Sequence, residues 1–378
     1  MVKKVLLIIL LLFVLTPIGY LSAQEGGTVG EVFEARVIDI LEERTLTSDQ
    51  AVKIQQNLKL EGLTGAFTDR QFEYYGIGDI EVIGSGSYKI GDRVLVNYTK
   101  DADGSEIFFV LEKVRRNDIY LLFGLFVVVV LIVGRSKGLR ALLALVMSFL
   151  VILKFIVPRV LAGSNPLIIA LIGSFLILLL IIYLTEGFNR KSHLAVLSIF
   201  LCLTLVFLLA DFFVGLLSLS GTVQEETAFL VSAGYGHINF QGLLLAAFLI
   251  GALGILDDVV VGQIEAVGQI KQANPSLPAK KLFKMAMAVG NAHLGSVINT
   301  LFLAYAGASF SLLLLFSIKQ PPFLSLTQVI SSELVATEIV RTLVGCIGLA
   351  LAIPLATIMA VWFYTPRPLK ENNRENQI

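Results

Sequence analysis

The stretch that decides the fold is residues 160–185, which read VLAGSNPLIIALIGSFLILLLIIYLT and contain no charged side chain. A helix needs about 20 residues to cross a hydrocarbon layer about 30 Å thick. This run is long enough for one crossing, and similar uncharged runs recur along the chain. The sequence therefore predicts a protein built mainly of transmembrane helices.

The composition of the whole chain supports this prediction. Of 378 residues only 15% are charged and 56% are hydrophobic, whereas soluble domains carry about a quarter charged residues. The 29 basic and 29 acidic side chains cancel, so the chain lacks the broad positive field that non-specific nucleic-acid binding needs. We expect the lipid bilayer, and no nucleic acid, among its partners. Cys202 and Cys346 lie in apolar runs, which argues against a disulfide framework and a thiolate metal site.

Residues 1–24 have the features of a secretory leader. Lys3 and Lys4 precede an apolar run from Val5 to Leu15, and Leu21–Ala23 offers a small-residue cleavage site. An uncleaved signal anchor is the alternative, because the apolar run can be extended. Both alternatives predict that the following residues are exported.

Residues 25–118 have the composition of a water-facing domain. Val94, Val96 and Tyr98 alternate with polar neighbours, and the Asp101–Gly104 segment resembles a turn. We therefore expect a small extracytoplasmic β-barrel or β-sandwich. This segment contains no His and no Cys, and it offers no catalytic constellation.

Residues 119–365 are predicted to form a helical membrane domain. The charge-poor runs that fit about seven transmembrane helices are 119–134, 139–157, 160–185, 192–210, 227–256, 285–318 and 342–365. The run 227–256 is longer than one crossing needs, so we expect Gly234, Gly236 and His237 to lie in a non-helical part.

Basic residues predict the direction of the helices. With residues 25–118 outside, most of the Lys and Arg side chains in the loops between the expected helices lie in inner loops, including Arg190, Lys191, Lys280 and Lys281, and the outer loops hold only Lys154, Arg159 and Lys319. This distribution agrees with the positive-inside rule. We expect a multi-pass protein of a bacterial inner or plasma membrane, with a cytoplasmic tail at 366–378.

Polar and small residues follow one stripe on each of the last three expected helices, at about 100° per residue. The stripes contain Gly251, Gly254, Asp258, Glu265 and Gln269 on the first helix; His293, Thr300 and Gly307, with Asn299 to one side, on the second; and Glu338 and Gly345, with Arg341 at the edge, on the third. We expect these stripes to converge on a polar seam that binds or conducts a solute, because ionisable groups inside a bilayer usually mark a path or a buried pair. The alternative is that Gly251, Gly254, Gly307 and Gly345 only allow close helix packing.

Individual residues narrow the chemistry further. Glu338 and Arg341 stand three residues apart, a spacing that favours a structural ion pair along one helix. His293 would need Asp258 or Glu265 as a second ligand to hold a metal, and we expect neither metal nor cofactor. Aspartyl hydrolysis is not favoured, because the adjacent Asp257 and Asp258 point about 100° apart on one helix.

Three separated motifs carry a resemblance to a known family. They are Gly251-Ala-Leu-Gly254 with Asp258, Val259 and Gln263; His293 with Asn299-Thr300-Leu301; and Glu338-Ile-Val-Arg341-Thr342 with Gly345. The chain resembles the YibE/F family of bacterial multi-pass membrane proteins, over the expected β domain and all the spans. The resemblance implies an exported β domain followed by a helical membrane domain, and no particular activity. The chain departs from the family pattern at Glu265, at Gln269 and at Asn291-Ala292 before His293.

These observations favour a permease-like protein that moves an ion or small solute through the seam of the last three helices. The alternative is a non-transporting envelope assembly or signalling factor whose exported β domain binds a partner. An enzyme is not favoured, because no nucleophile, base and orienting group can be assembled from the candidate residues. A homo-oligomer, or a hetero-oligomer with a related membrane protein, is compatible with either function.

Overall fold

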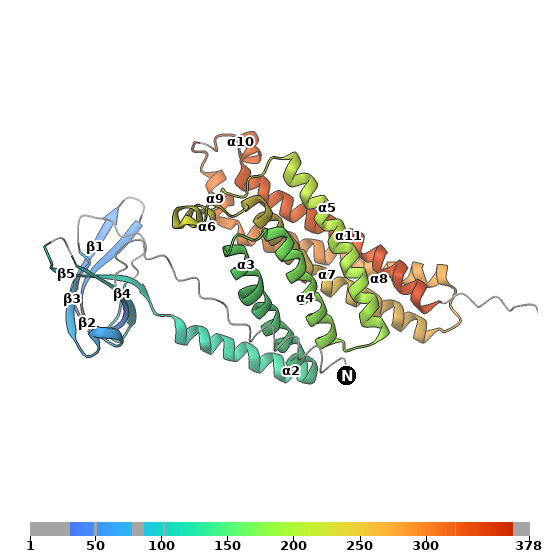
Figure 1. The fold of residues 1–378 in the computed structure, drawn as a ribbon, viewed down its shortest axis with the longest axis horizontal. Coiled ribbons are helices and arrows are strands. Elements are labelled where there is room, and N and C mark those ends of the chain that lie inside the picture. Colours follow the sequence, from blue (N-terminus) through green and yellow to red (C-terminus); the bar gives the residue numbers. More distant parts are fainter. Residues whose placement is uncertain (1–30, 49–50, 78–86, 101–102, 322, 366–378) are drawn as a thin grey trace, which may run out of the picture. The chain divides into compact units, whose positions relative to one another are not determined.

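The computed structural model describes residues 31–48, 51–77, 87–100, 103–321 and 323–365 (Figure 1). The expected leader at 1–24 and the expected tail at 366–378 lie outside these residues. The described chain divides into two compact units, one on each side of the Val133/Gly134 boundary, and each is described by itself.

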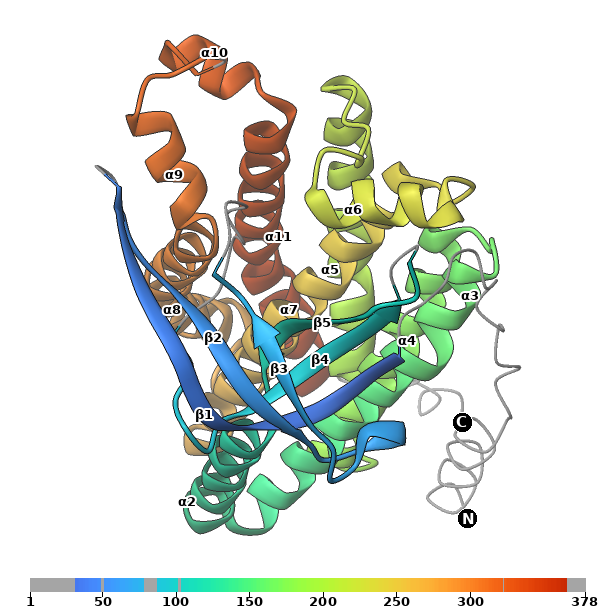
Figure 2. The same ribbon diagram turned by 90° about the vertical axis from the view of Figure 1, so that its left-hand side faces the viewer.

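The first unit contains an antiparallel sheet in the order β3-β2-β1-β4-β5, curved into a half-barrel (Figure 2). Its strands are β1 Glu31–Ser48, β2 Ala51–Gly62, β3 Gln71–Tyr75, β4 Arg93–Lys100 and β5 Glu106–Lys113. A short 3-10 helix, η1 Gly65–Phe67, joins β2 to β3. The small β domain that the sequence predicts is therefore present as one sheet, and the sandwich alternative is wrong.

An aromatic core holds the half-barrel together. Phe33 is 2% exposed and stacks on Phe67 with 4.6 Å between ring centroids, and Phe72 stacks on Phe108 at 4.3 Å. Arg70, just before β3, forms an ion pair with Glu106 at the start of β5. The contact draws the two edge strands toward each other.

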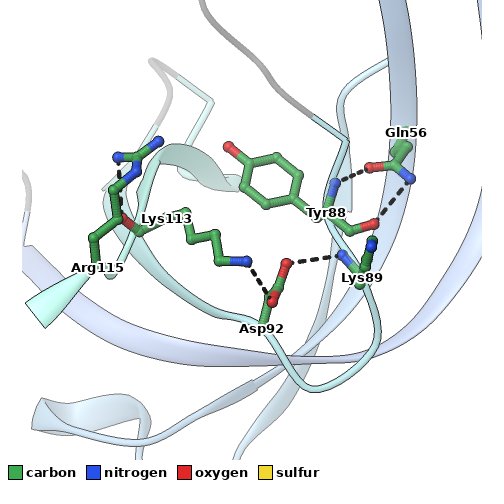
Figure 3. Close-up of polar contacts among 6 residues, drawn as sticks. All are labelled: Gln56, Tyr88, Lys89, Asp92, Lys113 and Arg115. Atoms are coloured by element: carbon green, nitrogen blue, oxygen red, sulfur yellow. Dashed lines mark hydrogen bonds and ion pairs between the residues drawn. The ribbon is translucent and has the colours of Figure 1, made fainter. Parts of the chain in front are cut away.

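Polar side chains also close this unit (Figure 3). The buried Gln56 amide donates to the Tyr88 carbonyl at 3.1 Å and accepts from the Tyr88 N–H at 2.7 Å. Lys113 Nζ donates to Asp92 Oδ1 at 2.7 Å, and the Lys89 N–H donates to Asp92 Oδ2 at 3.0 Å. The segment before β4 is thus tied to β2 and β5 by side-chain hydrogen bonds.

Helix α2, Arg116–Val151, crosses the boundary between the two units. Its helical backbone is interrupted at Arg135, where φ is 48° and ψ is −128°. The structure joins the first two expected spans into one helical stretch, Arg116–Leu161, and its described residues contain six helices long and apolar enough to cross a membrane. The stretch has 46 residues, about 69 Å at 1.5 Å per residue, so two crossings separated at Arg135 remain our prediction.

The second unit is helical. After α2 it contains the π-helix η2 Ile152–Ile156, α3 Val157–Leu161, α4 Pro166–Thr185, α5 Arg190–Leu216, α6 Glu225–Leu230, the π-helix η3 Val231–Tyr235, α7 Phe240–Ala273, α8 Ala279–Ala308, α9 Phe310–Ser317, α10 Leu326–Ser331 and α11 Glu333–Tyr364. Asparagine side chains cap three long helices: Asn165 starts α4, Asn189 starts α5 and Asn239 starts α7. Each asparagine side chain accepts a hydrogen bond from a backbone N–H group that has no partner within the first helical turn.

Helix α7 lies at the centre of the helical unit, against α4, α5, α8 and α11 (Figure 1). Of these six long helices it has the most buried apolar segment, at 56%. It begins at Phe240. Of the residues expected in a non-helical part, Gly236 and His237 lie in the turn before α7, whereas Gly234 lies within η3 but has a non-helical φ of 91°. The core around α7 positions the polar residues of this helix.

Candidate polar site on helices α7, α8 and α11

The polar stripe of α7 faces away from the core. Its members Gly251, Gly254, Asp258, Gly262, Glu265 and Gln269 are all exposed, and we call them the α7 stripe. Leu253, Val260 and Ile264 on the opposite face are buried. Sequence periodicity places the stripe on one face, and the structure leaves that face uncovered.

Asp258 occupies an open position in the middle of the stripe. No hydrogen bond or ion pair reaches its carboxylate from the described parts of the chain. Gly254 and Gly262, one turn away on either side, have no atom within 4 Å of the position that a Cβ would take. The neighbouring Asp257 is half-buried, and its Oδ1 is buried without a hydrogen-bond partner in the described structure. The two acids therefore lie in different surroundings.

The Ala273 end of the stripe contacts α5. Lys191 Nζ lies 3.2 Å from Glu265 Oε2, and Gln269 Nε2 donates to Glu265 Oε1 at 2.7 Å. Both charged side chains are about half exposed, so the pair contributes little to stability, at most about 1 kcal/mol. Glu265, to which Gln269 donates, is thus bound to α5, a helix that the predicted seam did not include.

The candidate residues of α8 are also open. His293, Asn299 and Thr300 are exposed, and the Thr300 hydroxyl donates to the Ser296 carbonyl of its own helix at 3.0 Å. Within the described residues, no hydrogen bond or ion pair joins them to Asp258, Glu338 or Arg341. The candidate residues of α8 therefore have no direct polar contact with these residues of α7 and α11, and the polar seam stays a prediction.

The residue that does join the three helices is Gln263. Its amide is buried and donates to the Ala286 carbonyl of α8 at 3.0 Å and to the Thr357 hydroxyl of α11 at 2.7 Å. A Cβ on Gly290 would lie 2.5 Å from Ile353 and 2.9 Å from Gln263 Oε1. The bare backbone of Gly290 is what lets α8 approach this amide.

Glu338 and Arg341 form the ion pair that their spacing predicts, near the start of α11. Arg341 Nη1 lies 2.9 Å and 3.1 Å from the two Glu338 oxygens, and the guanidinium stands over the Phe248 ring of α7 at 5.3 Å. Both side chains are mostly buried, with 22% of Arg341 and 19% of Glu338 exposed. An ion pair in such surroundings is costly to break.

Two cavities flank this ion pair. A cavity of about 70 Å³ has Arg341, Thr337, Glu333 and Gln224 in its wall. A larger cavity of about 360 Å³ lies between α8, α9 and α11, with an apolar wall that includes the polar residues Glu338, Tyr305 and Thr342. Each partner of the ion pair therefore lines a different cavity.

The four glycines of the expected packing stripes have different surroundings. A Cβ on Gly251 would lie 3.6 Å from the Tyr305 hydroxyl, and one on Gly345 would lie 3.5 Å from Leu301. Gly254 and Gly307 have open space instead. Tighter approaches occur at Gly290 and at Gly348, where a Cβ would lie 2.2 Å from Val206.

The described residues contain no group of three or more His, Cys, Asp and Glu side chains placed to hold a metal ion. Cys202 is buried, Cys346 is partly buried, and both are free thiols. What the site does offer is an uncompensated carboxylate on a long apolar helix, next to glycines with open space. Such a group interacts favourably with a cation, with water or with a polar partner.

The fold and these polar helices define a multi-span membrane protein. Residues 122–366 match the family described as YibE/F-like protein, and the chain belongs to this family. The match begins after the half-barrel sheet, although the sequence resemblance was expected to include that domain. No curated protein and no solved structure matches the chain.

Proposed function

We propose that this protein is permease-like and moves an ion or small solute along the α7 stripe. The single observation that carries the proposal is the exposed, unpaired Asp258 between two open glycines. Asp258 lies 18 residues after Phe240 in a helix of 34 residues, which is about 27 Å along a helix of about 51 Å. A carboxylate at mid-helix is costly in lipid and marks a functional path in many membrane proteins.

The chemistry of the stripe favours a cation, or a solute that carries a positive group. Asp258 and Glu265 are its charged members, and Lys191 compensates Glu265. Asp258 remains the uncompensated charge. The proposed path also includes a binding region toward the Phe240 end of α7. This region consists of Glu338, Arg341 and the cavities beside them.

Flux in proteoliposomes tests this function. Na⁺, K⁺, H⁺ and Mg²⁺ are measured one at a time with the native chain and with Asp258→Asn. Asp211→Asn is the matched control, because Asp211 is also an exposed acid on a long apolar helix but lies on α5, outside the stripe. We expect Asp258→Asn to lose the flux and Asp211→Asn to keep it. Equal flux from Asp258→Asn and the native chain overturns the proposal.

The proposed setting is a bacterial cell membrane with the β domain outside and the C-terminus in the cytoplasm. The distribution of Lys and Arg supports this direction. In cells, a membrane-impermeant thiol reagent should label Asp103→Cys, in the turn before β5, and leave Ser276→Cys, between α7 and α8, unlabelled. The opposite pattern reverses the topology.

A second candidate function is that of a non-transporting envelope factor. The observation that favours it is the β1–β2 hairpin. Among the described residues, β4 pairs with β1 along Glu31–Arg36, Val37 bonds to Gly91 and Asp92, and β3 pairs with β2 along Asn57–Glu61. Beyond these contacts the described part of the hairpin pairs with no further strand, so its backbone edges are available to a partner strand. Deleting residues 31–116 separates the functions: if flux survives the deletion but is lost in Asp258→Asn, the envelope-factor function is wrong.

A further inference from the structure

Helix α8 combines two properties that conflict in a single chain. Of these six long helices it is the least buried, with 17% of its apolar segment buried against 28–56% for the others, and this segment also has the lowest mean hydropathy. A helix that faces lipid should be the most apolar of the set, because lipid cannot satisfy polar groups. The exposed side of α8 is apolar near its C-terminal end, at Phe302 and Leu303, and its more polar part before them is poorly suited to lipid.

The side in question carries polar and basic residues on one continuous face. We define the open α8 face as the exposed residues Lys281, Val289, Ala292, His293, Ser296 and Asn299. His293 and Lys281 form no ion pair within the described chain. The α7 stripe next to α8 carries the opposite charge, on the unpaired Asp258 and on Glu265, which also pairs with Lys191 of α5.

The charges on the two faces also match in depth along the helices. The hydrogen bond from Gln263 to Ala286 fixes the register between α7 and α8. From that contact, at 1.5 Å per residue, Asp258 lies ~7.5 Å and His293 ~10.5 Å toward the Phe240 end of α7. Glu265 lies ~3 Å and Lys281 ~7.5 Å toward the Ala273 end. Each acid is within about one helical turn of a basic residue.

We propose that a second copy of this chain covers these faces, with the open α8 face of each copy packed against the α7 stripe of the other. A two-fold axis along the membrane normal keeps equivalent residues of both copies at equal depth. The charges on the open α8 face of one copy therefore match in depth the opposite charges on the α7 stripe of the other copy. Asp258 of each copy then faces His293 of the second copy. The open positions at Gly254 and Gly262 allow close approach of the two helices.

The proposal goes beyond transport and does not rest on it. Cross-linking reports proximity between chains, whereas flux reports movement of a solute. A dimer without flux would leave the interface standing and remove the proposed function, and flux from a chain without these contacts would do the reverse.

Cysteine cross-linking of the full chain in membranes tests the interface. In a background with Cys202→Ala and Cys346→Ala, one tagged chain carries Asp258→Cys and a differently tagged chain carries His293→Cys. On oxidation we expect a band of twice the chain mass that carries both tags. Because each chain has one cysteine, only contact between chains can produce this band.

A second pair protects the test against loss of the Asp258 charge. Gly262→Cys adds a side chain where nothing lies within 4 Å, and Val289 on the open α8 face is at a similar depth, ~1.5 Å against ~4.5 Å from the Gln263–Ala286 contact. Gly262→Cys on one chain and Val289→Cys on the other should give the same doubly tagged band.

The matched control is Thr204→Cys, which, like the test positions, is an exposed position on a long apolar helix but lies on α5. Paired with Asp258→Cys or Gly262→Cys it should give no doubly tagged band. The proposal is overturned if both test pairs cross-link no better than this control, or if the cysteines join only a different membrane protein.

Discussion

The half-barrel unit and the α7–α8 surface treat polar side chains in opposite ways. In the half-barrel, Gln56, Asp92 and Lys113 find partners within the unit. On α7 and α8, Asp258 and His293 have no partner in the described chain, although these helices are apolar enough to span a membrane. These three side chains of the first unit are satisfied within it, whereas Asp258 and His293 of the helical unit are not, and this difference favours the helices as the place of the proposed function.

The largest expected effect tests whether the half-barrel is closed around its aromatic core. Phe33→Ala removes a ring that is 2% exposed and stacked on Phe67, and such deletions cost about 3–5 kcal/mol. Amide hydrogen exchange of β4 in the full chain, followed by mass spectrometry, should show the opening free energy falling by that amount. A change as small as that of Val32→Ala, an exposed position on the same strand, would show that the core is loose.

The next effect contrasts closed and open positions on one helix. Gly290→Val drives a side chain into Ile353 and Gln263, whereas Gly295→Val enters open space. Overpacking of this kind costs about 1–3 kcal/mol. We expect the thermal unfolding of the detergent-solubilised protein to move down strongly for Gly290→Val and much less for Gly295→Val. Equal shifts for the two variants would contradict the packing at Gly290.

A smaller effect is expected at the junction of the three helices. Gln263→Leu removes the hydrogen bonds to Ala286 and Thr357, with a cost of about 1 kcal/mol because Thr357 keeps its bond to Ile353. Gln269→Leu, at an exposed position on the same helix, is the control. The melting temperature should fall for Gln263→Leu and stay close to native for Gln269→Leu. A larger fall of the melting temperature for Gln269→Leu would contradict the role of Gln263 as the junction of α7, α8 and α11.

The smallest effect is a pH dependence in the half-barrel. Burial raises the pKa of Asp92, but the hydrogen bonds from Lys113 and from the Lys89 N–H outweigh burial, and the net pKa is lowered. The folded carboxylate therefore stabilises the unit above the ordinary aspartate pKa of about 3.9, and this stabilisation is lost as the pH falls through the lowered folded pKa. We expect less than about 1 kcal/mol for a partly exposed pair.

Hydrogen exchange of β4 and β5, corrected for intrinsic rates, measures how the stability of the half-barrel changes with pH over about three units, from about pH 6 to about pH 3. Asp92→Asn should flatten the profile. An unchanged profile in Asp92→Asn would assign the acid sensitivity to another group.

Much of this architecture follows from the sequence because its signals are local. Alternation around Val94 and Val96 predicts a strand of the half-barrel, uncharged runs predict the long helices, and three-residue spacing predicts the Glu338–Arg341 pair. Each of these depends on residues that are near in sequence. The interruption of α2 at Arg135 was not predicted as a backbone feature, because a left-handed arginine has no local signal.

The candidate site depends on distant residues, and here the sequence is less informative. Gln263 bonds to Ala286 and Thr357, which are 23 and 94 residues away, so nothing in its own neighbourhood distinguishes it from Gln269. Periodicity places Asp258 and the glycines on one stripe but does not tell whether the core, lipid or water faces it. Only the packing of α4, α5, α8 and α11 around α7 determines that face.

The central claim is that the α7 stripe does not face lipid acyl chains. A spin label at Asp258→Cys, in the background without native cysteines, measures this through its collision rate with dissolved oxygen in liposomes. Ile172→Cys on α4, an exposed apolar position, gives the lipid-facing reference. We predict a markedly lower oxygen collision rate at position 258 than at position 172, and equal rates at both positions would contradict the account.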